Sequence, residues 1–145
     1  MTLQSSITSL KAASIFTIGT GLVFFFSLFT SADFLANLFF DIAIWPLDGT
    51  QDLNAGETRL LLAISGGMLV GWGVMFWLVT THIYAENPQI GGKVILFSIL
   101  SWFIIDSTGS IIAGFAANAV MNLVFLAIFA LPVMMHGSSV KKQAA

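Results

Sequence analysis

The sequence predicts an all-α integral membrane protein, folded as an antiparallel four-helix transmembrane bundle with a short interfacial amphipathic helix between the first two spanning helices. Three observations predict this class. Only 12 of the 145 residues are charged, and 57% are hydrophobic. The apolar residues gather in segments of about 20, the length that crosses a bilayer as a helix. The four lysines also fall on one side of four spans, with Arg59 as the one cation of the outer connection, and such a bias is typical of membrane proteins of fixed orientation.

The composition argues against other classes of protein. The charged fraction is 8%, against roughly 25% in an average soluble domain, and intrinsic disorder requires low hydrophobicity and high charge. A net charge of −2 offers no basic surface for nucleic acid. The absence of cysteine excludes disulfides, iron–sulfur clusters, thiolate zinc sites and cysteine catalysis. The acidic residues show no spacing for a metal site, so we expect no metal.

We expect one membrane domain over residues 1–145. Residues 94–135 are too long for one crossing and contain a single charge, Asp106, so they predict two helices with a turn near Gly114–Asn118. The four predicted spans are residues 12–30, 60–81, 94–114 and 117–135.

The cationic residues predict the orientation. Lys11 precedes the first span, Lys93 lies between the second and third, and Lys141 and Lys142 follow the fourth. Lysine and arginine concentrate on the cytoplasmic side of membrane proteins. Both termini are therefore expected in the cytoplasm, and the outer connection, residues 31–59, on the opposite side.

The outer connection contains a predicted amphipathic helix that ends before Pro46. Its apolar residues recur at helical spacing, and its polar residues form the opposite stripe. The apolar set is Phe34, Leu35, Leu38, Phe39 and Ile42, and the polar set is Asp33, Asn37 and Asp41.

The second span carries a stripe of small residues. Arg59, Ala63, Gly67 and Gly71 follow one another at intervals of four, with Gly66 and Gly73 beside them. Small residues at this spacing let transmembrane helices approach closely. The stripe indicates either ordinary packing within the chain, which we favour, or an interface with another subunit. In both cases this face is expected to be buried in protein.

Asp106 is the one acidic residue within a span, and such residues face a bundle interior or a water-filled cavity. Arg59 starts the second span at a similar depth, so we predict an Arg59–Asp106 ion pair. We favour a structural role for this pair, in which it clamps two helices together. The alternative is that the pair forms part of a proton or ion relay.

Asp106 belongs to an unusually polar stretch. Asp106, Ser110 and Gly114 align at intervals of four, and Asn118 and Asn122 do the same on the next helix. These groups are expected to form hydrogen bonds between helices. The alternative is a small polar cavity for a headgroup or a quinone.

His82 and His136 lie at the predicted cytoplasmic ends of their helices. Histidines can ligate a haem or a chlorophyll-type pigment, but interfacial anchoring explains both, and we predict no cofactor while leaving quinone and haem open.

The entry to the second span, Glu57-Thr58-Arg59, followed by Gly66-Gly67 and Gly71-Trp72-Gly73, resembles small four-helix bacterial membrane proteins of the DoxX-like group. The resemblance implies an antiparallel four-helix bundle in a bacterial plasma membrane. It also implies a link, known for some members, to quinone-dependent oxidoreductase complexes.

No catalytic motif is present, so we expect a non-catalytic protein. The favoured function is an accessory or assembly subunit of a larger membrane complex, with other membrane subunits or a second copy as partners. The alternative is a small-molecule transporter or quinone-linked component that uses a polar cavity around Asp106.

Overall fold

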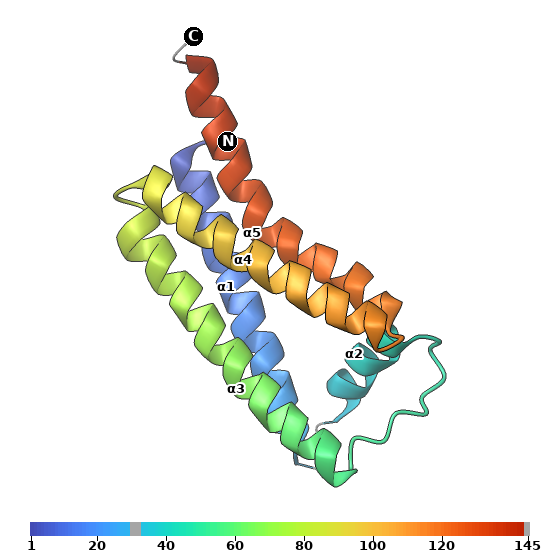
Figure 1. The fold of residues 1–145 in the computed structure, drawn as a ribbon. Coiled ribbons are helices and arrows are strands. Elements are labelled where there is room, and N and C mark those ends of the chain that lie inside the picture. The colour runs from blue at the N-terminus through green and yellow to red at the C-terminus, as the bar shows by residue number, and fades with distance from the viewer. Residues whose placement is uncertain (30–32, 144–145) are drawn as a thin grey trace.

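The computed structural model describes residues 1–29 and 33–143, with side chains up to Ser138. Within these ranges five α-helices and one short π-helix follow one another, and no strand is present (Figure 1). The helices are α1 (Leu3–Phe26), α2 (Phe34–Ile44), α3 (Gly56–Val79), the π-helix η1 (Thr80–Tyr84), α4 (Pro88–Ile112) and α5 (Ala116–Gln143). Four are long and apolar enough to cross a membrane, with η1 continuing the span of α3. The predicted all-α membrane fold is confirmed.

The bundle has a closed end and an open end. The start of α1, the end of α5 and the turn between α3 and α4 lie at the closed end (Figure 1). From that turn α3 and α4 diverge, and α2 lies between their separated ends (Figure 1). The long helices alternate in direction, as an antiparallel bundle requires.

Close contact between α1 and α3 depends on glycines. A Cβ atom placed on Gly66 would lie 2.9 Å from the Gly21 carbonyl oxygen, and one on Gly21 would lie 2.7 Å from the Gly66 carbonyl oxygen. A Cβ on Gly73 would lie 2.8 Å from the Ser14 carbonyl oxygen. All these distances are shorter than real Cβ contacts, so only glycine allows the two backbones to approach this closely.

The predicted burial of the small-residue stripe is wrong within this chain. Ala63, Gly67 and Gly71 are exposed, and a Cβ on Gly67 or Gly71 would meet no atom within 4 Å. Successive helical residues are separated by about 100°, because 3.6 residues make a turn. Gly66 therefore faces α1 while its neighbour Gly67 faces outward.

The closed end is held by a buried hydroxyl cluster, formed by the side chains of Ser6 and Tyr84 and the Pro132 carbonyl group. Ser6 Oγ lies 2.8 Å from the Tyr84 hydroxyl and donates to the Pro132 carbonyl oxygen at 2.9 Å. Tyr84 ends η1, and Gly91 packs directly against its backbone. The cluster therefore joins α1, η1 and α5, and Tyr84 also belongs to the buried apolar core of this end.

The first helix begins earlier than predicted. Thr2 caps it by accepting a hydrogen bond from the Ser5 backbone N–H at 3.1 Å, and threonine is a favoured residue at this position. Lys11 consequently lies inside α1 rather than before it, with Nζ 5.0 Å from the centre of the Trp77 ring. The side chains of Lys141 and Lys142 fall outside those that the structure describes.

The predicted amphipathic helix is present as α2. Phe39 and Phe40 pack on Phe24 of α1, with ring centres 4.9 and 5.5 Å apart. The apolar stripe is therefore divided: Phe39 contacts the bundle, while Phe34 and Leu38 remain exposed.

After α2 the chain turns through a loop that side chains stabilise locally. The Thr50 hydroxyl and backbone N–H donate to Asp48 Oδ1 at 2.7 and 3.1 Å. These hydrogen bonds, the hydroxyl first, lower the pKa of the Asp48 carboxyl below its ordinary value. Leu53 then buries itself against the core around Phe24, which ties the loop to the open end.

The predicted turn between the last two helices is present. Gly114 has a φ of +90°, a conformation that glycine adopts without strain. Helix α5 begins at Ala116, so Asn118 lies in its first turn rather than in the connection.

Candidate binding site

A cavity of about 490 Å³ lies where α3 and α4 diverge. All five α-helices contribute to its wall, and α2 contributes Phe39 from the open end. Its lining residues are Thr20, Phe24, Phe39, Ser65, Met68, Leu69, Trp72, Trp102, Asp106, Asn118, Asn122 and Phe125. The volume falls within the range of small-molecule sites, about 300–1,000 Å³.

Asp106 forms the polar wall of this cavity. It lies six residues before Ile112 ends α4, about 9 Å along the helix at 1.5 Å per residue. Its Oδ1 accepts hydrogen bonds from Asn122 Nδ2 at 2.6 Å, Asn118 Nδ2 at 3.1 Å and Ser110 Oγ at 3.4 Å. One carboxylate oxygen thus joins α4 to two successive turns of α5.

The two asparagine side chains are held by a second partner each. Asn118 Nδ2 also donates to Ser110 Oγ at 2.8 Å, and Asn122 Nδ2 to Ser107 Oγ at 3.1 Å. Asn122 is only 5% exposed. The structure therefore brings together four of the five predicted polar residues, Asp106, Ser110, Asn118 and Asn122, in hydrogen bonds between helices. Asp106, Asn118 and Asn122 also line the cavity.

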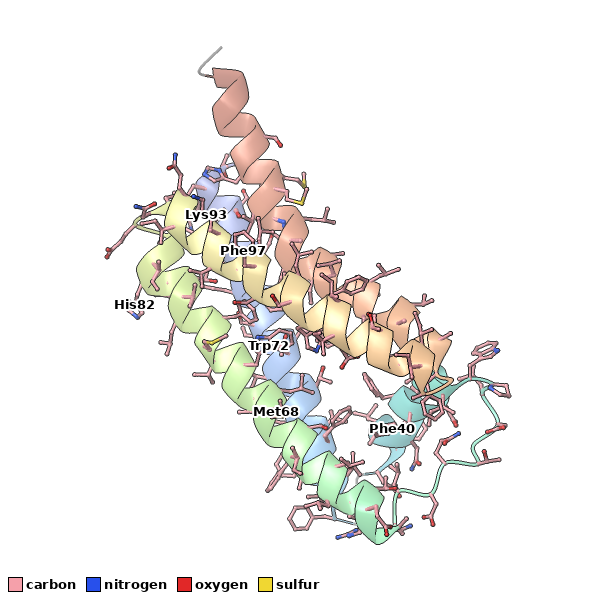
Figure 2. The ribbon with its side chains drawn as sticks, viewed as in Figure 1. Phe40, Met68, Trp72, His82, Lys93 and Phe97 are labelled. Carbon is pink, nitrogen blue, oxygen red and sulfur yellow. The ribbon has the colours of Figure 1, made fainter. Side chains whose placement is uncertain are left out.

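The remaining wall is mostly aromatic. The Trp72 and Trp102 ring centres lie 5.2 Å apart, and Trp102 lies 5.9 Å from Phe125. Figure 2 labels Trp72 on α3; Phe40, labelled on α2, packs on Phe24 and is not one of the lining residues. The cavity is therefore amphipathic: one end carries a carboxylate and two amides, and the rest is apolar except for the hydroxyl side chains of Thr20 and Ser65.

The predicted ion pair between Arg59 and Asp106 is wrong. Arg59 Nη2 donates to the Leu28 carbonyl oxygen at 2.9 Å, and Asp106 has no cationic partner within the described residues. Because α3 packs on α1, Arg59 meets the chain just beyond the end of α1. The start of α3, which carries Arg59, and the end of α4, which carries Asp106, lie apart at the open end of the bundle (Figure 1).

The two histidines do not share a site. His82 is exposed on η1, whereas His136 Nδ1 lies 3.4 Å from the Met1 carbonyl oxygen and its ring faces Tyr84. Within the described ranges no group of three or more histidine, aspartate or glutamate side chains could hold a metal ion.

Sequence reasoning missed the aromatic wall and Ser107. Trp72 and Trp102 could have been suspected, since both lie away from the membrane interface where tryptophan is enriched. Nothing in the spacing showed that they face one another across the bundle. Ser107 follows Asp106 directly, but the intervals of four around Asp106 drew attention to Ser110 instead.

Comparison with protein-family models, with curated proteins and with solved structures finds no match. The resemblance to the DoxX-like group therefore stays a prediction.

Proposed function

We propose that this chain binds a small amphipathic molecule within the membrane, as a transporter or as a component that presents the molecule to a partner. The single observation that supports the proposal is the amphipathic cavity at Asp106. Ionisable residues inside spans are costly, and they mark substrate and ion pathways. A carboxylate at the wall of an otherwise aromatic cavity fits that role better than a purely structural clamp, which needs no adjoining space.

The experiment uses tryptophan fluorescence of the purified full-length protein in lipid nanodiscs. Trp45→Phe and Trp77→Phe leave Trp72 and Trp102, which both line the cavity. Bromophenylbutanol serves as the probe, because its bromine quenches a tryptophan that it touches. We expect quenching that saturates with probe concentration at a fixed amount of lipid.

Two variants distinguish quenching by probe bound in the cavity from quenching by probe dissolved in the surrounding lipid. Ser65→Phe fills the cavity from α3, whereas Ile64→Phe adds the same group at an exposed position next to it. Saturable quenching should be lost in the first and kept in the second. Quenching that rises linearly with the probe and is equal in both variants would refute the proposed function.

We propose an accessory subunit as the second candidate, on the observation that Ala63, Gly67 and Gly71 form an exposed face of small residues on α3. Such a face accepts a closely packed helix. Isolation in mild detergent should recover a stoichiometric partner or a second copy. Gly67→Leu should release it, while Ile105→Phe, at an exposed position of α4, should not. Recovery of a lone monomer would exclude this candidate.

We also propose that the closed end faces the cytoplasm, in a bacterial plasma membrane. Lys93 lies near that end (Figure 2), and the acidic loop before α3 lies at the other. The distribution follows the tendency of basic residues to stay inside. A cysteine introduced at Glu86 should be labelled by an impermeant maleimide only after the membrane is broken; labelling of intact cells would reverse the orientation.

A further inference from the structure

The polar end of the cavity has free acceptor atoms and no free amide hydrogen. Both hydrogens of Asn118 Nδ2 have partners, Asp106 and Ser110, and both of Asn122 Nδ2 have theirs, Asp106 and Ser107. Within the described residues, Asp106 Oδ2 and the Oδ1 atoms of the two asparagines accept no hydrogen bond. Asp106, Asn118 and Asn122 all line the cavity, so a ligand at its polar end lies beside three residues that each keep one oxygen acceptor without a hydrogen bond.

These oxygens belong to side chains that their own hydrogen bonds hold in place. Asn122 is 5% exposed, and it lines the cavity. If its amide were turned over, its oxygen would face the Asp106 carboxylate instead of donating to it. The contact with Asp106 thus fixes which atom of Asn122 remains free for a ligand.

The carboxylate also lacks a counter-ion. Of the cationic side chains that the structure describes, Arg59 lies on the Leu28 carbonyl oxygen and Lys11 lies over Trp77. Lys93 is 13 residues from Asp106 on the same helix, about 20 Å away. A negative charge within a span is costly without a cation, and a bound cation offsets that cost.

The facing wall suits a cation with an apolar body. Trp72 and Trp102 lie beside one another and line the cavity together with Asp106. Indole rings attract a cation placed over their faces and bury apolar groups equally well. Acceptors, an unpaired carboxylate and paired indoles thus converge on one space.

From this convergence we infer that the ligand is an amphipathic primary amine in its ammonium form. An ammonium group presents three N–H donors and no acceptor, which matches three free oxygens and one negative charge. A ligand whose head only accepts hydrogen bonds, such as a ketone or a carboxylate, finds no free amide hydrogen on Asn118 or Asn122, and a carboxylate head is also repelled by Asp106. The inference rests on the proposed binding function and names the chemical class of its ligand.

The test compares probes with one body and different heads, using the same quenching assay. Bromophenylbutylamine, bromophenylbutanol and bromophenylbutyrate differ only in the head group. Hydrogen bonds that involve a charged group are stronger than neutral ones by an amount that corresponds to roughly a tenfold difference in affinity. We expect the amine to bind about tenfold more tightly than the alcohol, and the butyrate to show no saturable binding.

Asp106→Asn removes the charge, and Glu57→Gln is the matched control because Glu57 is an exposed acid outside the cavity. The preference for the amine should disappear in the first and persist in the second. If Asp106→Asn does not fold, as judged by circular dichroism, the head-group series on the unmodified cavity decides alone.

The outcomes separate the inference from the function on which it rests. If the alcohol binds as tightly as the amine, the ammonium inference is overturned while cavity binding stands. If no probe gives saturable quenching, both the proposed binding in the cavity and the inference about the ammonium group are refuted. A trimethylammonium analogue has the charge without N–H donors; if it binds as tightly as the amine, the free oxygens are not what selects the ligand.

Discussion

Replacing Gly66 and Gly67 separately by alanine tests how α1 and α3 are held together. Both substitutions add one methyl group to the same helix, and both raise helix propensity by about 1 kcal/mol. They differ in what the methyl group meets. At Gly66 it lies 2.9 Å from the Gly21 carbonyl oxygen and 3.2 Å from the Phe25 backbone nitrogen, whereas at Gly67 nothing lies within 4 Å.

The magnitude follows from that difference. Ordinary contact begins at 3.4 Å, so the methyl group at Gly66 must open the gap from 2.9 Å by 0.5 Å. The atoms in the way belong to backbone, so the two helices must separate together. Overpacking of this kind costs about 1–3 kcal/mol. Because the propensity gain is shared, Gly66→Ala should be less stable than Gly67→Ala by about that amount.

The assay is reversible unfolding in mixed micelles, in which the fraction of denaturing detergent is increased and helix content is followed by circular dichroism. We expect Gly67→Ala to equal or exceed the original chain in stability. Equal stability of the two variants would refute the close-contact reasoning. A larger loss for Gly67→Ala would instead mean that another helix covers the exposed stripe.

Three further predictions concern individual polar contacts. Because Arg59 and Asp106 are not paired, the stability losses of Arg59→Gln and Asp106→Asn should add within about 0.5 kcal/mol in the double variant; a larger coupling energy from unfolding in mixed micelles would restore the ion pair. Tyr84→Phe removes one hydroxyl from the buried hydroxyl cluster, and should lower the free energy of unfolding by about 0.5–1.5 kcal/mol; no loss in the same assay would show that the cluster contributes nothing. Thr50→Val should raise the pKa of Asp48 toward its ordinary value, seen by titrating the carboxyl carbon in NMR spectra. Since that pKa is lowered in the folded chain, its stabilisation is present above the unfolded pKa and lost as pH falls through the folded pKa; an unchanged pKa in the variant would contradict the role of the hydroxyl.

Local patterns predicted the presence and order of the helices better than the bounds of the first helix, Leu3–Phe26, or the contacts between helices. The length of an apolar segment is a property of the segment itself, so the four spans and α2 could be located in the sequence. The hydrogen bonds of Asp106 with Asn118 and Asn122 also follow from local features, because a short turn makes α4 and α5 neighbours.

The pairing of Arg59 was beyond such reasoning. Equal depth in the membrane does not show which helices are adjacent, and α3 packs on α1 rather than along the end of α4. For the same reason the sequence did not show that Gly66, rather than Gly67, packs on α1. The spacing of small residues identifies a stripe on the helix, but it does not show on which side the neighbouring helix lies. The cavity exists because α3 and α4 diverge. The hydropathy pattern of a sequence does not report the angle between two helices, so the cavity could not be predicted from it.

Met68 lines the cavity and is 68% exposed, on a helix long and apolar enough to span a membrane. The cavity thus reaches the surface of the bundle at a point that acyl chains surround, while the other end of the bundle is sealed by packed side chains. A molecule dissolved in the bilayer would enter sideways, without first crossing an aqueous vestibule. The concentration of ligand at the cavity is then set by how strongly the ligand partitions into the bilayer. The fraction of cavities occupied should therefore depend on the ratio of ligand to lipid in the membrane more than on the concentration of ligand in water.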